Sequence, residues 1–375
     1  MYYYFIVHLL RIILPLIFIQ LLSQNYESSI TTSWLKFLLF FQFSMQMTES
    51  GVSLSGPILF QKFGSIKSLL NKILLYQVVI GVVVFIIFLI FNPSMINMIA
   101  ILAGIFQGLS LTWVLRFKEK HKIWFFSEAI FRVLLYASLV IGIFFHVDLL
   151  FFSSTLLAFS FVWFAVVFTY VSRNYIVSKD FRFKSFSILS QGLLLKYFAN
   201  FMYPGLIIFG ESFFVYEQLL VLEIDKIVQG FRGFFGPIID YLFPKAIKRR
   251  NSIKVKLAIL LVGGGLSAGL MIFLPFIIKF LFNIETERTF FMMIYSLVPL
   301  LISITHIFGT LGLVVDDKIK SYLKIFALAI VSASIFIYFN NLAGYVIMPY
   351  IVLSLGLLMH KLIVKPFNKK ELEQK

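Results

Sequence analysis

Residues 222–237 read LEIDKIVQGFRGFFGP, and this stretch decides the fold class of the chain. It lies between the apolar segments FGESFFVYEQLLV and IIDYLF, which are typical of a membrane-spanning helix. Yet two acids, Glu223 and Asp225, and two bases, Lys226 and Arg232, lie inside it. At about 100° per residue, most of its polar residues share one wedge of a helix, opposite the isoleucine and phenylalanine side chains. The stretch therefore predicts an amphipathic membrane helix whose polar face is turned away from lipid.

The composition of the whole chain points to the same environment. Of its 375 residues, 60% are hydrophobic and 13% are charged, and the mean hydropathy is +0.96. A soluble domain keeps about a quarter of its residues charged, so this composition predicts a polytopic membrane protein. The net charge of +16 comes from short basic runs between apolar blocks. The positive-inside rule explains these runs better than nucleic-acid binding does, and no nucleic-acid partner is expected.

The apolar blocks are long enough to be transmembrane helices, which need about 20 residues each. Every second loop, and the C-terminus, carries most of the Lys and Arg, whereas the alternate loops hold one base, Arg288. This alternation predicts that both termini lie in the cytoplasm. The absence of an N-x-[ST] sequon favours a bacterial chain, whose inner membrane is then the expected location. The twelve predicted spans are 3–23, 30–54, 73–92, 95–115, 123–145, 149–171, 186–209, 213–243, 256–281, 289–314, 321–339 and 342–363.

The longest loop, residues 172–185, divides the spans into two sets of six. GPIL at 56–59 ends the second span and GPII at 236–239 ends the eighth, which favours a parallel repeat of two halves. The predicted fold is an all-α integral membrane protein with twelve transmembrane helices in two six-helix bundles around a central cavity. The N-terminal bundle is expected at 1–178 and the C-terminal bundle at 179–375.

Polar residues follow one helix face in spans 1, 2, 7 and 8, the first two helices of each half. Because a charge at the middle of a bilayer costs several kcal/mol, these four faces predict a hydrated cavity between the halves. The candidate cationic residues for substrate binding are Arg11, Lys196, Lys226 and Arg232. Further candidates, which line the cavity or couple transport to an ion, are Gln42, Gln46, Glu49, Asn200, Glu223, Asp225 and Gln229.

The residue types in this predicted cavity favour an anionic cargo, such as a phosphate or pyrophosphate head group. The acids Glu49, Glu223 and Asp225 either hold the bases in place or carry a coupling proton or Na⁺. No cofactor and no metal site are expected, because the five His are scattered without ligand spacing. The sequence holds no P-loop, GxSxG or HExxH motif, so the chain is predicted to be a transporter without catalytic residues rather than an enzyme.

Several polar and small residues also have a purely structural interpretation. Glu128 and Arg132 are spaced i, i+4 in span 123–145 and are predicted to pair and to hold helices together. Glu223 and Lys226 are open to the same interpretation. The motifs GIFQG at 104–108 and GLSAG at 265–269 are predicted to be sites of helix packing.

The stretch VYEQLLVLEIDKIVQGFRGFFGPIIDYLFPKAIKRR resembles the eighth span of the bacterial Wzx-type polysaccharide-unit flippases, within the MATE-like MOP superfamily. The likeness lies in an acidic-Lys-Ile pattern, a Pro-Ile pair and a Phe-Pro pair before a basic loop, at 225–227, 237–238 and 243–244. TESGVSLSGPILFQK, LTWVLRFKEKHKIWFF and SQGLLLKYFANFMYPGLIIFG resemble the second span, the turn from span 4 to span 5, and the seventh span of that family.

This resemblance implies a V-shaped cavity lined by spans 1, 2, 7 and 8. It implies that the chain flips undecaprenyl-diphosphate-linked oligosaccharide units, as in O-antigen and lipopolysaccharide synthesis, from the cytoplasmic to the periplasmic leaflet. The expected partners are this lipid-linked oligosaccharide, membrane lipids and other glycan-assembly membrane proteins. A MATE-like exporter of small molecules is the main alternative. A membrane polymerase of the same pathway is less favoured, because every predicted outer loop is only a few residues long.

Overall fold

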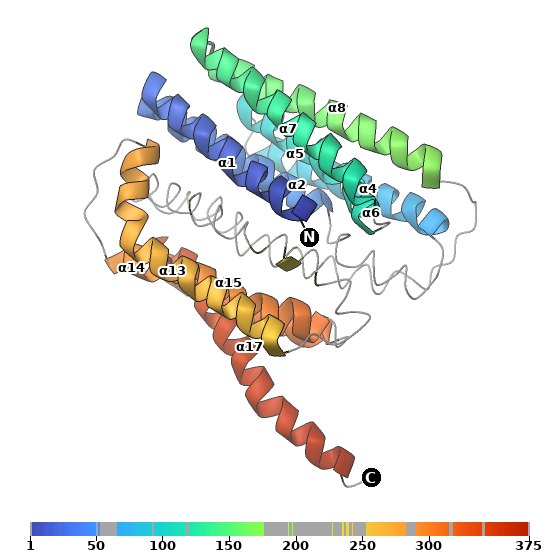
Figure 1. Cartoon of the computed structure of the whole chain (residues 1–375), viewed down its shortest axis with the longest axis vertical. Coiled ribbons are helices and arrows are strands. Elements are labelled where there is room, and N and C mark those ends of the chain that lie inside the picture. Colours follow the sequence, from blue (N-terminus) through green and yellow to red (C-terminus); the bar gives the residue numbers. More distant parts are fainter. Residues whose placement is uncertain are drawn as a thin grey trace. The chain divides into compact units, whose positions relative to one another are not determined.

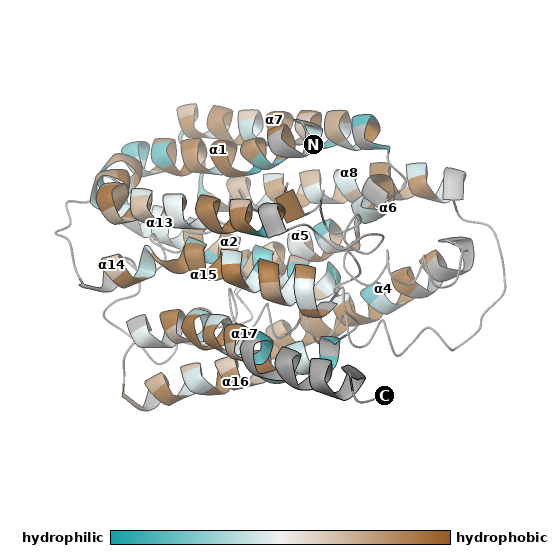
Figure 2. Ribbon diagram, turned by 60° about the horizontal axis from the view of Figure 1, so that its bottom comes forward, coloured by the Kyte–Doolittle hydropathy of each residue, from teal (hydrophilic) through white to brown (hydrophobic). Residues whose placement is uncertain are grey.

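The computed structural model describes residues 2–49, 52, 66–91, 94–117, 120–175, 253–282, 290–314, 318–339 and 342–373, with the single positions 194, 197, 227, 235, 238, 239 and 242. Within these residues every regular element is a helix. Seven described stretches are long and apolar enough to cross a membrane, by length and composition. Figure 2 shows the hydrophobic colouring that runs along most of these helices.

The chain divides into two compact units (Figure 1). Unit 1 consists of Met1–Asn200 with Phe280–Asn283, and unit 2 of Phe201–Lys279 with Ile284–Lys375. The predicted boundary between residues 178 and 179 lies outside the described residues.

In unit 1, helix α5 packs against α2, α4 and α8. Within this unit, α1 packs along α7. Its helices are α1 (Tyr2–Asn25), α2 (Ser28–Glu49), α4 (Ile66–Phe91), α5 (Met95–Leu109), α6 (Thr112–Phe117), α7 (His121–Phe144) and α8 (Leu149–Tyr175).

A cluster of buried aromatic rings joins four of these helices. The Phe18 ring on α1 makes edge contacts with Trp34 on α2, at 5.3 Å between centroids, and with Phe152 on α8, at 5.5 Å. Tyr136 on α7 lies 6.3 Å from the same phenylalanine ring. All four side chains are buried. Edge-to-face pairs of this kind add about 0.5–1.5 kcal/mol each to the burial of apolar area, so this cluster holds α1, α2, α7 and α8 together.

The crossing of α2 and α5 confirms that the 104–108 motif is a packing site. A Cβ on Gly108 would lie 2.5 Å from the Met45 carbonyl oxygen and 2.8 Å from the Thr48 Cβ, and one on Gly104 would collide with the backbone of α2. The fully buried Gln77 of α4 closes the same crossing, because its Nε2 donates to the Gly108 carbonyl at 3.3 Å. Only glycine allows the two helices to approach this closely.

The helices of unit 2 are α13 (Ile253–Phe282), α14 (Phe290–Tyr295), α15 (Val298–Ile304), the π-helix η3 (Thr305–Val314), α16 (Ile319–Tyr338) and α17 (Leu342–Glu373). The last three residues of α13, 280–282, belong to unit 1. The longest packed pair is α16 with α17. Polar side chains fix α15 against both of its neighbours: the Ser267 hydroxyl of α13 accepts from the Leu300 amide at 3.0 Å, and the Ser354 hydroxyl of α17 donates to the Leu301 carbonyl at 3.0 Å.

The second predicted packing motif, at 265–269, has no such role among the described residues. Nothing in that part of the chain lies within 4 Å of a Cβ built on Gly265 or Gly269. The close approach on α13 is made instead by Gly263, whose Cβ would meet Ser303 of α15 at 2.6 Å. Residues 265–269 do lie in a helix, but the glycine of α13 that packs against α15 is Gly263.

Ten of the twelve predicted spans coincide with described helices or helix groups. The other two, 186–209 and 213–243, lie almost wholly outside the described residues. Two predicted spans are divided: 95–115 into α5 and α6, and 289–314 into α14, α15 and η3. Large apolar side chains such as Ile90 and Leu261, 68% and 67% exposed, stand on helix faces that are suited to contact with lipid.

Candidate functional site

A buried carboxylate lies inside α7, in a stretch that is long and apolar enough to span a membrane. The Glu128 side chain is 1% exposed and lies seven residues after the first residue of α7, roughly 10 Å along the axis at 1.5 Å per residue. An acid at such a position is retained only where cations or hydrogen-bond donors neutralise it. The surroundings of Glu128 are therefore the first place to look for a functional site.

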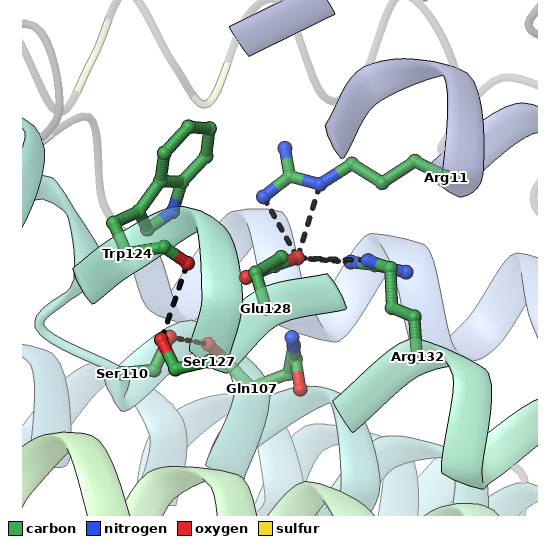
Figure 3. Close-up of polar contacts among 7 residues, drawn as sticks. All are labelled: Arg11, Gln107, Ser110, Trp124, Ser127, Glu128 and Arg132. Carbon is green, nitrogen blue, oxygen red and sulfur yellow. Dashed lines mark hydrogen bonds and ion pairs between the residues drawn. The ribbon is translucent and has the colours of Figure 1, made fainter. Parts of the chain in front are cut away.

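Two arginines meet at this carboxylate (Figure 3). Nε and Nη2 of Arg11, on α1, lie 3.1 and 3.0 Å from Glu128 Oε1. Nε and Nη2 of Arg132, on α7, lie 2.8 and 2.7 Å from the same oxygen. The side chain of Arg11 is 30% exposed and that of Arg132 is 17% exposed. We call these three side chains the arginine–glutamate cluster.

The local sequence of α7 explains why Arg132 contacts Glu128, but not why Arg11 does. Glu128 and Arg132 are one turn apart on α7, and the i, i+4 spacing brings their side chains together on one helix face. Trp124, one turn before Glu128 on the same face, presents its ring to the Arg11 guanidinium, with 5.9 Å between Cζ and the ring centroid. Arg11 itself joins the cluster only because α1 packs along α7.

The cluster carries more positive than negative charge. It consists of two guanidinium cations and one carboxylate anion, so the three side chains sum to +1. In a low-dielectric environment this surplus attracts anions and repels cations far more strongly than it would in water. Guanidinium groups also offer paired donors that match phosphate and carboxylate oxygens.

Further polar groups surround the cluster (Figure 3). The Ser127 hydroxyl donates to the Ile123 carbonyl at 2.7 Å, and the Ser110 hydroxyl donates to the Gln107 carbonyl at 2.7 Å. Within the described structure, the Gln107 Oε1 atom is buried and accepts no hydrogen bond. This part of unit 1 is thus a polar region within an apolar bundle.

The structure places the residues predicted from the sequence as follows. Arg11 lies in the cluster, and Gln42, Gln46 and Glu49 lie on α2, where each is half-buried. The remaining candidates lie outside the described residues: Lys196, Asn200, Glu223, Asp225, Lys226, Gln229 and Arg232. Their roles stay predictions, as do those of the α2 residues.

The sequence analysis missed the link between Arg11 and Glu128. It assigned Glu128 to a structural pair with Arg132, and this pairing is confirmed at 2.7 Å. The acids expected to hold the basic residues of the cavity were Glu49, Glu223 and Asp225. The signal that points to Glu128 is its position as the one acid of the predicted span 123–145. Among the described residues, no group of three His, Cys, Asp or Glu is arranged to hold a metal ion.

Comparison with known proteins gives the fold. No family model matches the chain, and no curated protein matches it by sequence. A mutant of the Vibrio cholerae MATE transporter VcmN matches with a TM-score of 0.64 at 12% identity, over 97% of this chain and 95% of that one. An outward-facing multidrug resistance MATE family transporter of the MOP superfamily matches with a TM-score of 0.64 at 12% identity, over 98% and 96%.

A third solved structure, a MATE protein in the straight conformation, matches with a TM-score of 0.61 at 11% identity, over 99% of this chain and 95% of that one. At these identities the likeness concerns the fold. The chain is a multi-pass, all-α membrane protein with the fold of MATE transporters of the MOP superfamily.

Proposed function

We propose that this chain is a membrane transporter and that its cargo carries negative charge. The observation that carries the proposal is the match to MATE transporters over 97–99% of the chain, with TM-scores of 0.60–0.64. Because the match covers the whole length, it applies to the complete transporter fold rather than to one bundle. Such folds work by alternating access, in which two bundles rock about a site near the middle of the membrane.

The charge of the cargo follows from the arginine–glutamate cluster. Two arginines and one glutamate leave a surplus of positive charge within the apolar part of unit 1. A surplus of this sign favours phosphate, diphosphate or carboxylate groups and disfavours organic cations. The sequence candidates Lys196, Lys226 and Arg232 would add to it.

For the class of cargo, the solved structures support small-molecule export, since one of them is a multidrug resistance transporter. On this hypothesis the chain exports anionic small molecules across the bacterial inner membrane. The acids Glu49, Glu223 and Asp225 are then the candidates for coupling export to a flow of protons or Na⁺.

The second candidate is the flipping of a lipid-linked oligosaccharide. The observation in its favour is the resemblance of residues 215–250 to the eighth span of the Wzx-type flippases. A diphosphate linked to undecaprenol is the anionic group that the cluster would meet. Both termini would lie in the cytoplasm, where the basic loops are predicted, and other glycan-assembly proteins would be partners.

One experiment separates the two classes of cargo. The leaflet location of lipid-linked oligosaccharide is measured in cells with and without the chain, and efflux of an anionic dye is measured in the same cells. Flipping is supported if the oligosaccharide accumulates in the cytoplasmic leaflet on deletion and returns outward on re-expression. Export is supported if only dye efflux changes. The transporter hypothesis fails if neither quantity depends on the chain.

A matched pair of variants connects the result to the site. Arg11→Gln removes a cation of the cluster, whereas Lys122→Gln removes an exposed cation of the same bundle from α7. We expect the first variant to lower transport at least tenfold and the second to leave it unchanged. Equal transport by the wild type and Arg11→Gln would remove the cluster from the transport pathway.

A further inference from the structure

The contacts at Glu128 are unevenly distributed over its carboxylate. Four guanidinium nitrogens, two from each arginine, lie within 3.1 Å of the single oxygen Oε1. A carboxylate oxygen has two lone-pair sites. Four donors at one oxygen therefore share fewer acceptor sites than they need, and the two arginines compete for the same atom.

The two arginines are not equivalent in this competition. Arg132 has the shorter contacts, 2.7 and 2.8 Å, and is held beside Glu128 by the i, i+4 spacing on α7. Arg11 comes from another helix, has contacts of 3.0 and 3.1 Å, and is the more exposed of the two, at 30% against 17%. If Arg11 turns away, Arg132 still neutralises Glu128, so Arg11 is the arginine that can exchange its partner.

We propose that Glu128 acts as an internal competing anion: an anionic phosphate or carboxylate group takes Arg11 from Glu128 while Arg132 keeps Glu128 neutralised. This inference rests on the proposed transport of an anionic cargo and gives that site a mechanism. The incoming group adds negative charge to a cluster whose three side chains sum to +1. Its arrival also removes the ion pair that joins the side chains of α1 and α7, so binding changes how these two helices are held together.

The proposal predicts an effect that a purely structural role for Glu128 does not. Glu128→Gln removes the competitor, so an anion at Arg11 should bind about tenfold more tightly. Arg132→Gln leaves Glu128 to Arg11 alone, so the same anion should bind at least tenfold more weakly although Arg11 is present. A Glu128 that only holds the helices together would make Glu128→Gln weaken binding.

Trp124 provides the reporter, since its ring faces the Arg11 guanidinium. The full chain with Trp34→Phe, Trp113→Phe and Trp163→Phe keeps Trp124 as its single tryptophan. If this background does not fold, the difference between the wild type and Trp124→Phe isolates the same signal. Inorganic pyrophosphate is titrated into nanodiscs of phosphatidylcholine, and phosphatidylglycerol is raised stepwise in a second arm without pyrophosphate.

A saturable change of Trp124 fluorescence with pyrophosphate, lost in Arg11→Gln and kept in Lys122→Gln, identifies a free or cargo diphosphate as the ligand. The same Arg11-dependent change with phosphatidylglycerol identifies a lipid phosphate. The proposal is overturned if neither arm gives such a change, or if Glu128→Gln binds more weakly than the wild type.

The double variant and Arg132→Gln keep the test decisive if Glu128→Gln does not fold. The double variant Glu128→Gln/Arg132→Gln removes the competing carboxylate together with the arginine that neutralises it. It should therefore bind pyrophosphate at least as tightly as the wild type. Wild-type affinity in Arg132→Gln alone would refute the competition. Binding without transport of oligosaccharide or dye would leave the exchange intact and refute the proposed function. Normal transport in Arg11→Gln would leave the transporter function intact and refute a role for the exchange in it.

Discussion

Replacing Gly108 by alanine tests the closest helix approach in unit 1. The new Cβ would lie 2.5 Å from the Met45 carbonyl oxygen, about 0.9 Å inside ordinary contact at 3.4 Å, and 2.8 Å from the Thr48 Cβ. Neither atom can rotate away, so we expect the upper end of the overpacking cost, about 3 kcal/mol. Alanine regains about 1 kcal/mol of helix propensity over glycine. The net loss of stability is thus about 2 kcal/mol, measured as SDS-induced unfolding in mixed micelles.

The second glycine motif supplies the matched control. Gly265→Ala makes the same change in a helix where no described atom lies within 4 Å of the new Cβ. We expect it to stabilise the protein by up to about 1 kcal/mol through helix propensity alone. The two variants should therefore differ by about 3 kcal/mol. If both unfold at the wild-type SDS fraction, α2 and α5 do not meet as closely as the distances state and the packing argument is refuted.

Three other changes follow from single contacts. Ser267→Ala leaves the half-buried Leu300 amide without its acceptor at 3.0 Å and should cost about 1 kcal/mol in the same SDS titration. Tyr26→Phe removes a hydrogen bond to the Val147 carbonyl at 2.9 Å and should cost about 1 kcal/mol. Burial raises the pKa of Tyr26, so the stability it gives is present below its ordinary pKa of about 10 and is lost as the pH rises through the folded value. Melting curves at rising pH should therefore show a larger loss of stability in the wild type than in the variant. Glu128→Ala leaves two arginines without their shared carboxylate and should cost about 3–5 kcal/mol in thermal unfolding, and an unchanged melting temperature would contradict the buried ion pair.

The sequence was sufficient to predict most of the helices, because the bilayer imposes one length and one polarity on every span. That constraint explains why ten predicted spans coincide with described helices to within several residues. It contains no information on breaks inside a span. The segment 289–314 holds no Asp, Glu, Lys or Arg, yet it is divided at Ser296 and Leu297 and continues as the π-helix Thr305–Val314. The break at residues 296–297 has a local signal, because Pro299 lies in the first turn of α15 and has no N–H with which to continue the preceding helix. The contacts of this segment with Ser267 and Tyr322 join residues that are distant in sequence.

The candidate site was predicted only as far as local spacing reaches. The pairing of Glu128 with Arg132 follows from two positions one turn apart, and the structure confirms it at 2.7 Å. The pairing of Arg11 with Glu128 joins residues 117 positions apart and depends on which helix packs against α1. A stripe of polar residues predicts that one face of a helix is turned away from lipid, but it does not predict which helix packs against that face.

The position of Arg11 also argues for a role beyond helix packing. Glu128 and Arg132 form a complete ion pair on one helix, so α7 does not need Arg11 to neutralise its buried acid. A second guanidinium at the same oxygen adds a desolvation cost of several kcal/mol and, because both arginines share Oε1, gains less than a first partner would. An apolar residue at position 11 would pack α1 against α7 without that cost. An exchange of Arg11 from Glu128 to an anionic group during the transport cycle would give this arrangement a function, and the opposite responses expected of Glu128→Gln and Arg132→Gln decide whether the exchange occurs.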